Sequence, residues 1–316
     1  MRYLFVFFFF VSGTNLIGQN LLVPTTKNII DNELTITFDI SKNVTGHSDV
    51  QVIIRNKKGN IVFPIEISGD LKNLKSGDKK QIICKLNPKD KITNKFSVEL
   101  SINPSLDSTI IYPKNQKYGF VVDQENEIYR TIKIGNQTWM AENLRKTHFN
   151  TGEKINFITE KENFKPSINS FLTAYNFDSL SYKKQGFYYS WQVVNDNRGI
   201  CPIGWHVPKD SEWKVLVKEL KNEKIVFKLA ENNSNHWKNI DLDSLNQNST
   251  GFTAIPTGCM NEDGSFKETY TSCYWWSNSH YYQNFSCYFN IDLKSKNHNH
   301  LNGSQNIGMP VRCVKD

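Results

Sequence analysis

Residues 201–213, Cys-Pro-Ile-Gly-Trp-His-Val-Pro-Lys-Asp-Ser-Glu-Trp, constrain the fold of this chain more than any other stretch. Apolar side chains follow at the spacing of one helix face: Trp213, Leu216, Val217 and Leu220. Pro208 suits the approach to that helix but not its interior, and Asp210 can accept hydrogen bonds from the free amides of the first turn. The stretch therefore predicts an amphipathic helix that begins near residue 210.

The tryptophans divide the chain into two differently built parts. All seven lie at or after Trp139, and none precedes it. A chain of 316 residues is long for one domain, so this shift favours two domains. The net charge of +7 comes from scattered lysines, without the dense basic runs that track phosphates, so we expect no nucleic-acid partner.

Residues 1–19 have the features of a secretory signal peptide. A positive end precedes the apolar residues 3–11, and Gly18 is a small residue near the expected cleavage site. The apolar run is shorter than the about 20 residues that span a bilayer, and no cysteine follows it for lipid attachment. We therefore expect an exported protein, periplasmic, on the cell surface or secreted, with no transmembrane segment after cleavage.

Residues 20–103 predict an all-β domain. Five runs have the composition or the period-two alternation of strands: 34–40, 50–54, 61–67, 81–86 and 96–102. Residues 58–60 predict a hairpin turn, and Pro64 places its run at a sheet edge or bulge. Short strands at even spacing favour an immunoglobulin-like sandwich, with Cys84 buried in a strand. Residues 104–118 have the composition of a linker, although the run 110–112 also fits a last strand.

Several motifs of the second half resemble the signature of the Fibrobacter succinogenes major paralogous domain, a family of bacterial envelope and secreted modules. They follow in order at residues 135–144 (Gly-Asn-Gln-Thr-Trp-Met-Ala-Glu-Asn-Leu), 201–213, 263–266 (Asp-Gly-Ser-Phe), 274–277 (Tyr-Trp-Trp-Ser) and 311–314 (Val-Arg-Cys-Val). That family is similar in fold to C-type lectins and to formylglycine-generating enzymes. The resemblance implies an α+β, C-type-lectin-like domain over residues 119–316, and it implies no settled activity.

The first half carries a second resemblance. The layout of Val50, Gly59 and Phe63 with the Ser-Gly-Asp triplets at 68–70 and 76–78 resembles the small β-sandwich that precedes such domains in Bacteroidetes envelope proteins. This resemblance implies a spacer or docking domain in front of the lectin-like one.

For residues 119–316, the lectin-like fold that the resemblance implies is a short sheet with one main helix and the chain's end beside its start. Strands are expected at 128–134, 137–140, 251–256, 274–277, 285–291 and 307–314, a second short helix at 226–230, and a hairpin turn at 263–264. Residues 156–185 are polar and interpreted as an insertion or long surface loop. Five tryptophans are expected in the core: Trp139, Trp205, Trp213, Trp275 and Trp276.

Six cysteines in an exported chain are expected to be paired rather than reactive. Cys201 and Cys313 both lie in stretches that carry the family resemblance, and we expect a disulfide between them. Among Cys259, Cys273 and Cys287 one further pair is expected, with Cys259–Cys273 preferred.

The candidate metal and catalytic sites are weak. Residues 195–196, an Asn-Asp pair like the calcium ligands of sugar-binding lectins, lack the other oxygens that calcium requires and fit a turn. His298 and His300 could share a strand face as metal ligands, but their asparagine-rich surroundings favour an exposed loop. His206 is expected to pack beside Trp205. No nucleophile elbow, phosphate loop or carboxylate dyad is evident, so we expect no enzyme and no cofactor.

These features together predict an exported, non-catalytic recognition or surface module. A glycan or protein would be contacted by residues 156–185, 231–248 and 294–306, with Tyr281, Tyr282 and Tyr288 available to stack on a sugar. The alternative is a structural or assembly component of the envelope, bound to an envelope protein or another copy. A copper oxidase similar to formylglycine-generating enzymes is a weaker alternative, because the cysteine spacing does not match.

Overall fold

The computed structural model describes residues 22–42, 44, 48–72, 74–88, 96–104, 110–165, 170–178, 181–221, 223–232, 236–237 and 248–316. The predicted signal peptide lies outside these residues. The chain divides into two compact units, Met1–Thr109 with Gly119–Ile128, and Ile110–Tyr118 with Tyr129–Asp316. The second unit thus includes part of the segment predicted as a linker, and residues 119–128 group with the first unit.

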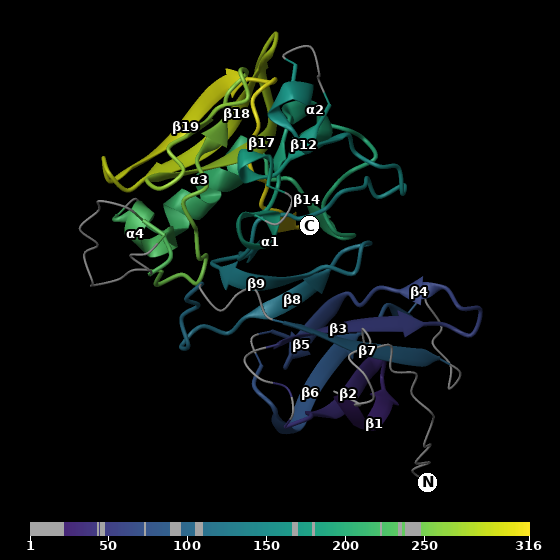
Figure 1. Ribbon diagram of the computed structural model, residues 1–316. Helices are drawn as coiled ribbons and strands as arrows, with labels where there is room; N and C mark the ends of the chain where they lie inside the picture. Colours follow the sequence, from purple (N-terminus) through teal and green to yellow (C-terminus); the bar gives the residue numbers. More distant parts are fainter. Residues whose placement is uncertain are drawn as a thin grey trace. The chain divides into compact units, whose positions relative to one another are not determined.

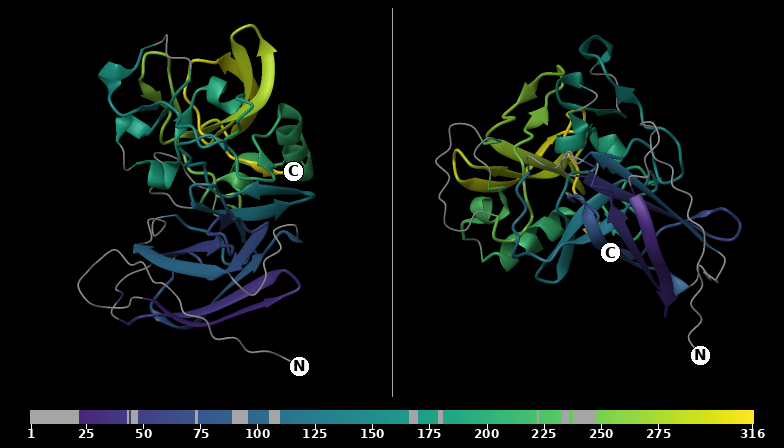
Figure 2. Two further views of the ribbon diagram at one scale, coloured as in Figure 1. Left: turned by 90° about the vertical axis from the view of Figure 1, so that its right-hand side faces the viewer. Right: turned by 60° about the horizontal axis from the view of Figure 1, so that its bottom comes forward.

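The first unit consists of two antiparallel sheets (Figures 1 and 2). One has the strand order β1 (Leu22–Ile30), β2 (Glu33–Ile40), β6 (Gly77–Lys85), β5 (Glu66–Gly69) and β8 (Gly119–Val122), and the other β4 (Ile61–Val62), β3 (Ser48–Arg55) and β7 (Ser97–Pro104). Every second side chain of β2 and β3 enters one shared core. The period-two prediction is confirmed there, and Cys84 is buried on β6.

The predicted strand 61–67 is wrong, because its two halves belong to different sheets. β4 ends at Val62, Pro64 follows without an N–H to donate, and the chain joins the other sheet as β5. The predicted hairpin turn before β4 is confirmed: the Gly59 amide donates to the Asn56 carbonyl at 2.8 Å, with Gly59 at a φ of 83°.

In the second unit, the hairpin of β9 (Ile128–Ile134) and β10 (Gln137–Met140) starts an antiparallel set of strands. β20 (Val314–Lys315) pairs with β10 on one side and with β14 (Trp205–His206) on the other. The end of the chain therefore returns beside the start of this unit, as expected. Residues 251–256 contain an isolated bridge instead of the predicted strand.

A second sheet of this unit contains β17 (Ser272–Tyr282), β18 (Phe285–Asp292) and β19 (Asn297–Ser304). The helices α3 (Asp210–Glu219) and α4 (Ile225–Leu229) lie along one of its faces (Figure 1). Both predicted helices are confirmed. Of the strand predicted over 307–314, only Val314 is in a strand, β20, which belongs to the other sheet. The third strand beside β17 and β18 is β19, in a segment interpreted as a loop.

The first turn of α3 is capped by a different residue from the one expected. Asp210 is the first residue of the helix, and its carboxylate bonds to Lys214 and His300. The carboxylate of Glu212 accepts a hydrogen bond of 2.8 Å from the Lys209 amide.

Residues 156–185 are not one long surface loop. They include β11 (Phe157–Ile158), η3 (Lys161–Asn163), β12 (Leu172–Thr173), η4 (Tyr175–Phe177) and α1 (Tyr182–Gln185), and β13 (Tyr188–Tyr189) and α2 (Trp191–Val194) follow. β15 (Cys259–Met260) and β16 (Phe266–Lys267) flank the turn that was predicted at 263–264. A small separate core packs this segment against β15 and contains Phe164, Phe171, Tyr188 and Met260.

The described chain is mostly β-structure with a few short helices. Within the part of the chain that the structure describes, no helix is long and apolar enough to cross a membrane.

Candidate functional site

Aromatic rings make up much of the buried core beneath the loops of the second unit. The five tryptophans expected in the core are all buried, the most accessible being Trp205 at 8%. The ring of Trp213 on α3 lies 4.5 Å from Trp139, 4.8 Å from Phe289 and 5.7 Å from Trp275, measured between centroids. These rings connect the β9–β10 hairpin, α3 and the β17–β19 sheet in one continuous core.

The disulfide between Cys201 and Cys313 is confirmed, with 6.0 Å between the two Cα atoms. The carbonyl of Cys313 also accepts a hydrogen bond of 3.0 Å from the Met140 amide. The bond therefore ties the segment before α3 to the hairpin and to the end of the chain.

The predicted pairing of Cys259 with Cys273 is wrong, because both thiols are free and buried. The Cys273 thiol lies in the tryptophan-rich core and donates to the Ile255 carbonyl at 3.0 Å, whereas Cys259 lies outside that core on β15. Burial raises the pKa of Cys259 to about 12 and that of Cys273 further still. Both thiols are therefore poor nucleophiles.

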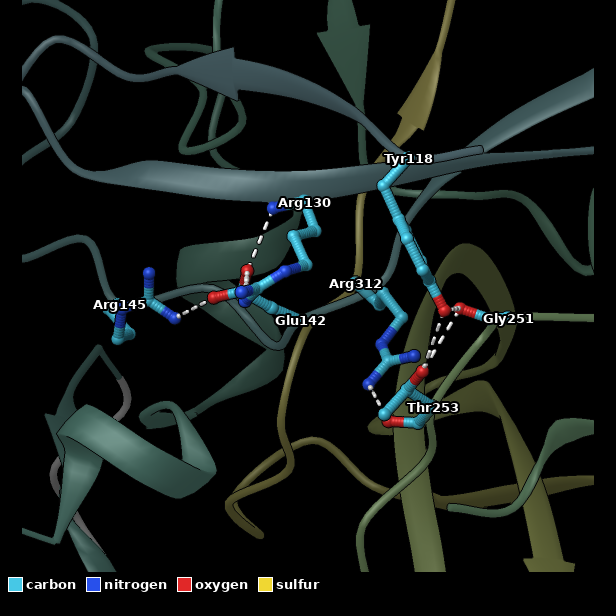
Figure 3. A network of polar contacts seen from close by, with 7 residues as sticks. All are labelled: Tyr118, Arg130, Glu142, Arg145, Gly251, Thr253 and Arg312. Atoms are coloured by element: carbon cyan, nitrogen blue, oxygen red, sulfur yellow. Dashed lines mark hydrogen bonds and ion pairs between the residues drawn. The ribbon is translucent and has the colours of Figure 1, made fainter. Parts of the chain in front are cut away.

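The first family motif places Glu142 in a buried ion network (Figure 3). Its carboxylate accepts 2.8 Å hydrogen bonds from the Arg130 amide and from the Arg145 guanidinium, and the Arg130 guanidinium lies at 3.5 Å. All three side chains are at most 8% exposed. Removing one partner of such a network leaves a buried charge uncompensated.

The next residue, Asn143, connects three distant parts of the sequence. Its Oδ1 accepts hydrogen bonds from Trp275 Nε1 at 2.9 Å and from Arg312 Nε at 3.1 Å. Its Nδ2 donates to the Gln185 carbonyl at 2.8 Å. The motifs of residues 135–144, 274–277 and 311–314 therefore meet at one amide.

Arg312 is a cation fully inside the domain, at 1% exposure. Its guanidinium donates to the carbonyls of Phe252 and Thr253 and lies 4.2 Å from the centroid of the Phe252 ring, near Tyr118 and Thr253 in Figure 3. Burial lowers the pKa of Arg312 to about 10. Sequence reasoning missed this role, and the available signal was an arginine inside the apolar stretch 311–314.

The accessible site is the end of the β17–β18 hairpin. Tyr281 and Tyr282 are each 62% exposed, and Phe285 across the turn is 46% exposed. We call these three residues the aromatic tip. Large aromatic side chains exposed together at one hairpin end are typical of a contact surface.

Hydrogen bonds from His280 and Gln305 hold the turn of the aromatic tip in place. The Gln283 carbonyl accepts hydrogen bonds from His280 Nε2 at 2.8 Å and from Gln305 Nε2 at 3.4 Å. The Gln305 amide donates to the Asn284 carbonyl at 2.9 Å, and the buried Trp191 ring lies 5.8 Å from the His280 ring. A turn braced in this way loses little conformational entropy when a ligand binds.

Tyr288, the third predicted contact, lies apart from the aromatic tip. It is half-buried on β18, and its ring packs 5.8 Å from Tyr274 and 6.4 Å from Trp276. Successive side chains of a strand point to opposite faces, so Tyr288 faces away from Phe285. Its cross-strand neighbour is Leu301, which is 44% exposed.

The histidines are held by internal contacts. The expectation that His298 and His300 lie in an exposed loop is wrong: both are on β19, and their rings pack on Phe289. His300 Nδ1 lies 2.8 Å from the Asp210 carboxylate. His206 does not simply pack beside Trp205, since it bridges Glu212 and Asp316.

The predicted turn at residues 195–196 is confirmed, because Asp196 accepts hydrogen bonds from the amide and guanidinium of Arg198. In the described ranges, no three His, Cys, Asp or Glu side chains are grouped so that they could hold a metal ion. Of the predicted loop 231–248, residues 233–235 and 238–247 lie outside the described residues.

Comparison with known protein families identifies the part of the chain that forms this site. The family model of the Fibrobacter succinogenes major domain matches residues 132–315, which is more than half of the chain. No curated protein and no solved structure matches the chain significantly. The matched range includes Asn143, Arg312 and the Cys201–Cys313 disulfide, which together hold the loops. This chain therefore belongs to the Fibrobacter succinogenes major domain family.

Proposed function

We propose that the protein is an exported, non-catalytic surface module that recognises a glycan through the aromatic tip. In this proposal the second unit is a C-type-lectin-like domain of the α+β class, and the first unit is an immunoglobulin-like spacer. The observation that carries the proposal is the exposure of Tyr281 and Tyr282 on a braced hairpin.

The chemistry of the aromatic tip suits a saccharide better than a purely apolar partner. A tyrosine ring packs on the apolar C–H face of a sugar, and its hydroxyl remains available to a hydrogen bond. Amide side chains flank the rings, with Gln283 Nε2 donating to the Tyr282 hydroxyl at 3.1 Å and Asn284 next in the turn. A few convergent polar groups beside apolar rings are typical of small-molecule sites.

The test is a glycan array probed with the full chain, followed by titration of any sugar that binds. Tyr281→Ala with Tyr282→Ala is expected to abolish binding, because the stacking surface is removed. Tyr282→Phe is expected to retain most of it, because the ring remains. Tyr270→Ala is the matched control, since Tyr270 is also exposed, at 40%, but lies outside the hairpin.

Circular dichroism of each variant checks that the fold is retained. Failure of the wild-type chain to bind any glycan contradicts the proposal, as does binding that survives the double substitution. Capture of an envelope protein that depends on Tyr281 and Tyr282 would instead favour the assembly role.

A further inference from the structure

The strand β19 forms an open edge of the β17–β18–β19 sheet. It pairs with β18 on one side, and no other described segment hydrogen-bonds to its second side. The eight residues Asn-His-Asn-His-Leu-Asn-Gly-Ser contain no proline and no Lys, Arg, Asp or Glu, and the register with β18 has no bulge. Charges, prolines and bulges are the usual means by which exposed edges avoid pairing.

The direction of the backbone groups on β19 follows from its register. The Gln305 amide donates to the Asn284 carbonyl at 2.9 Å, one step beyond the pair Phe285–Ser304. Hydrogen-bonded and non-bonded pairs alternate along an antiparallel ladder. The odd-numbered residues of β19 therefore bond to β18, and His298, His300 and Asn302 direct their N–H and C=O groups away from the sheet.

We propose that this edge pairs with the same edge of a second copy of the chain, antiparallel about a two-fold axis at His300. His300 then exchanges two hydrogen bonds with the partner's His300, and His298 and Asn302 each exchange two with the partner's Asn302 and the partner's His298. All the outward groups of these three residues are satisfied in one register. Such an interface is isologous and closes with two copies.

The charges around β19 favour a second copy over an unrelated strand. The strand itself contains no Lys, Arg, Asp or Glu, so two copies place no such like charges opposite each other across the axis. At each end, Lys296 comes opposite the partner's Ser304. The hydroxyl of Ser304 is hydrogen-bonded to the Glu262 carboxylate, which places an acid beside that lysine.

The exposed Leu301 adds an apolar contact near the axis. It is 44% exposed and borders Tyr288 on the neighbouring strand. In the paired sheet the two leucines lie on the same face, one residue to either side of the axis, where each covers the other in part. The aromatic tip belongs to β17 and β18 and includes none of the outward-facing residues of β19, so this inference does not depend on the proposed function.

The decisive measurement is sedimentation equilibrium of the full chain without its signal peptide, over a wide concentration range. The wild type is expected to show a reversible monomer–dimer equilibrium. Asn302→Pro removes an outward N–H, leaves the β18 ladder intact and is expected to weaken dimerisation by about tenfold or more. Leu301→Lys is expected to do the same by placing two like charges near the axis. Val215→Lys, at a residue 50% exposed on α3, is the matched control and is expected to dimerise like the wild type.

Thermal unfolding of each variant distinguishes a lost interface from a lost fold. A wild-type chain that stays monomeric at every concentration overturns the proposal. A dimer that persists in both Asn302→Pro and Leu301→Lys overturns it as well, because the contact would then lie elsewhere. If the chain stayed monomeric and bound an extended peptide at β19, the edge would serve another partner, and the proposal of a second copy would be rejected.

Discussion

The two units reach a packed core by different means. Among the described residues, the first buries mainly Leu, Ile and Val from long ladders, together with the rings of Phe38 and Phe120, and its sequence contains no tryptophan. The second contains all seven tryptophans, three buried arginines (Arg130, Arg145 and Arg312) and a disulfide, and many of its strands are two residues long. Stability is therefore spread over many similar contacts in the first unit and concentrated in a few side chains in the second.

This difference has a consequence for what each unit can present. Regular ladders satisfy backbone groups along their whole length, which leaves little irregular surface. In the second unit, Asn143, Arg312 and the disulfide join segments that lie outside long ladders. Single substitutions in the second unit are expected to have large effects that do not reach the first.

The largest expected effect follows from replacing both Cys201 and Cys313 with serine. The two residues are 112 positions apart, and closing a loop of that size stabilises by about 4–5 kcal/mol in the chain-entropy model. Tryptophan fluorescence during denaturant unfolding measures the loss in the second unit alone, since the first has no tryptophan. Cys287→Ser, at a free and partly exposed thiol, is the control and is expected to change little. Equal destabilisation by the control would contradict this prediction.

Trp213→Ala comes next, at about 3–5 kcal/mol for removing a fully buried aromatic ring. The ring touches Trp139, Trp275 and Phe289, so its loss opens a cavity at the centre of the second unit. Phe38→Ala is the matched change in the first unit, where hydrogen exchange on β2 and β3 reports the loss. If either substitution lowered the stability of both units equally, the comparison drawn above would fail.

Asn143→Ala is expected to cost about 2–3 kcal/mol, because it leaves the Trp275 indole and the Arg312 guanidinium without their shared acceptor. Asn143→Asp retains an acceptor oxygen beside Arg312 and is expected to lose less. Chemical denaturation followed by fluorescence compares the two variants. A larger loss in Asn143→Asp than in Asn143→Ala would show that hydrogen bonding to Arg312 is not the dominant contribution.

Sequence alone predicted the regular parts of both units. The alternation of Leu34, Ile36 and Phe38 and the helical spacing from Trp213 to Leu220 each leave a periodic trace, because one face of a long element is buried. Two-residue strands such as β11 and β14 leave none. β19 was misinterpreted because its asparagines and histidines lack β propensity, and its pairing with β18 outweighs that.

The site was predicted unevenly for a related reason. Tyr281 and Tyr282 are exposed, but an aromatic residue on a strand carries no sign of the face it occupies until the register is known, and Tyr288 was misplaced with them. The Cys201–Cys313 disulfide was recognised through its motif. The bond predicted between Cys259 and Cys273 is absent, because a disulfide depends on side-chain directions that spacing does not encode.

The smallest expected effect concerns His206, a partly exposed side chain that bridges the carboxylates of Glu212 and Asp316. Partial burial lowers the pKa of His206, but hydrogen bonds and charge from Asp316 and Glu212 outweigh it, so the pKa is raised above 6.5. The protonated ring therefore favours the folded state. Its stabilisation is complete below the unfolded pKa and is lost as the pH rises through the folded pKa.

His206→Gln removes that contribution and tests its sign. The difference in unfolding midpoint between wild type and variant is expected to be largest at a pH just above the range where carboxylates titrate, and to shrink as the pH rises past neutrality. Because the His206 side chain is 37% exposed, screening keeps the effect small, and added salt reduces it further. A difference that grew with pH would mean that the neutral ring is the form the fold prefers, and the contacts to Glu212 and Asp316 would then be incidental.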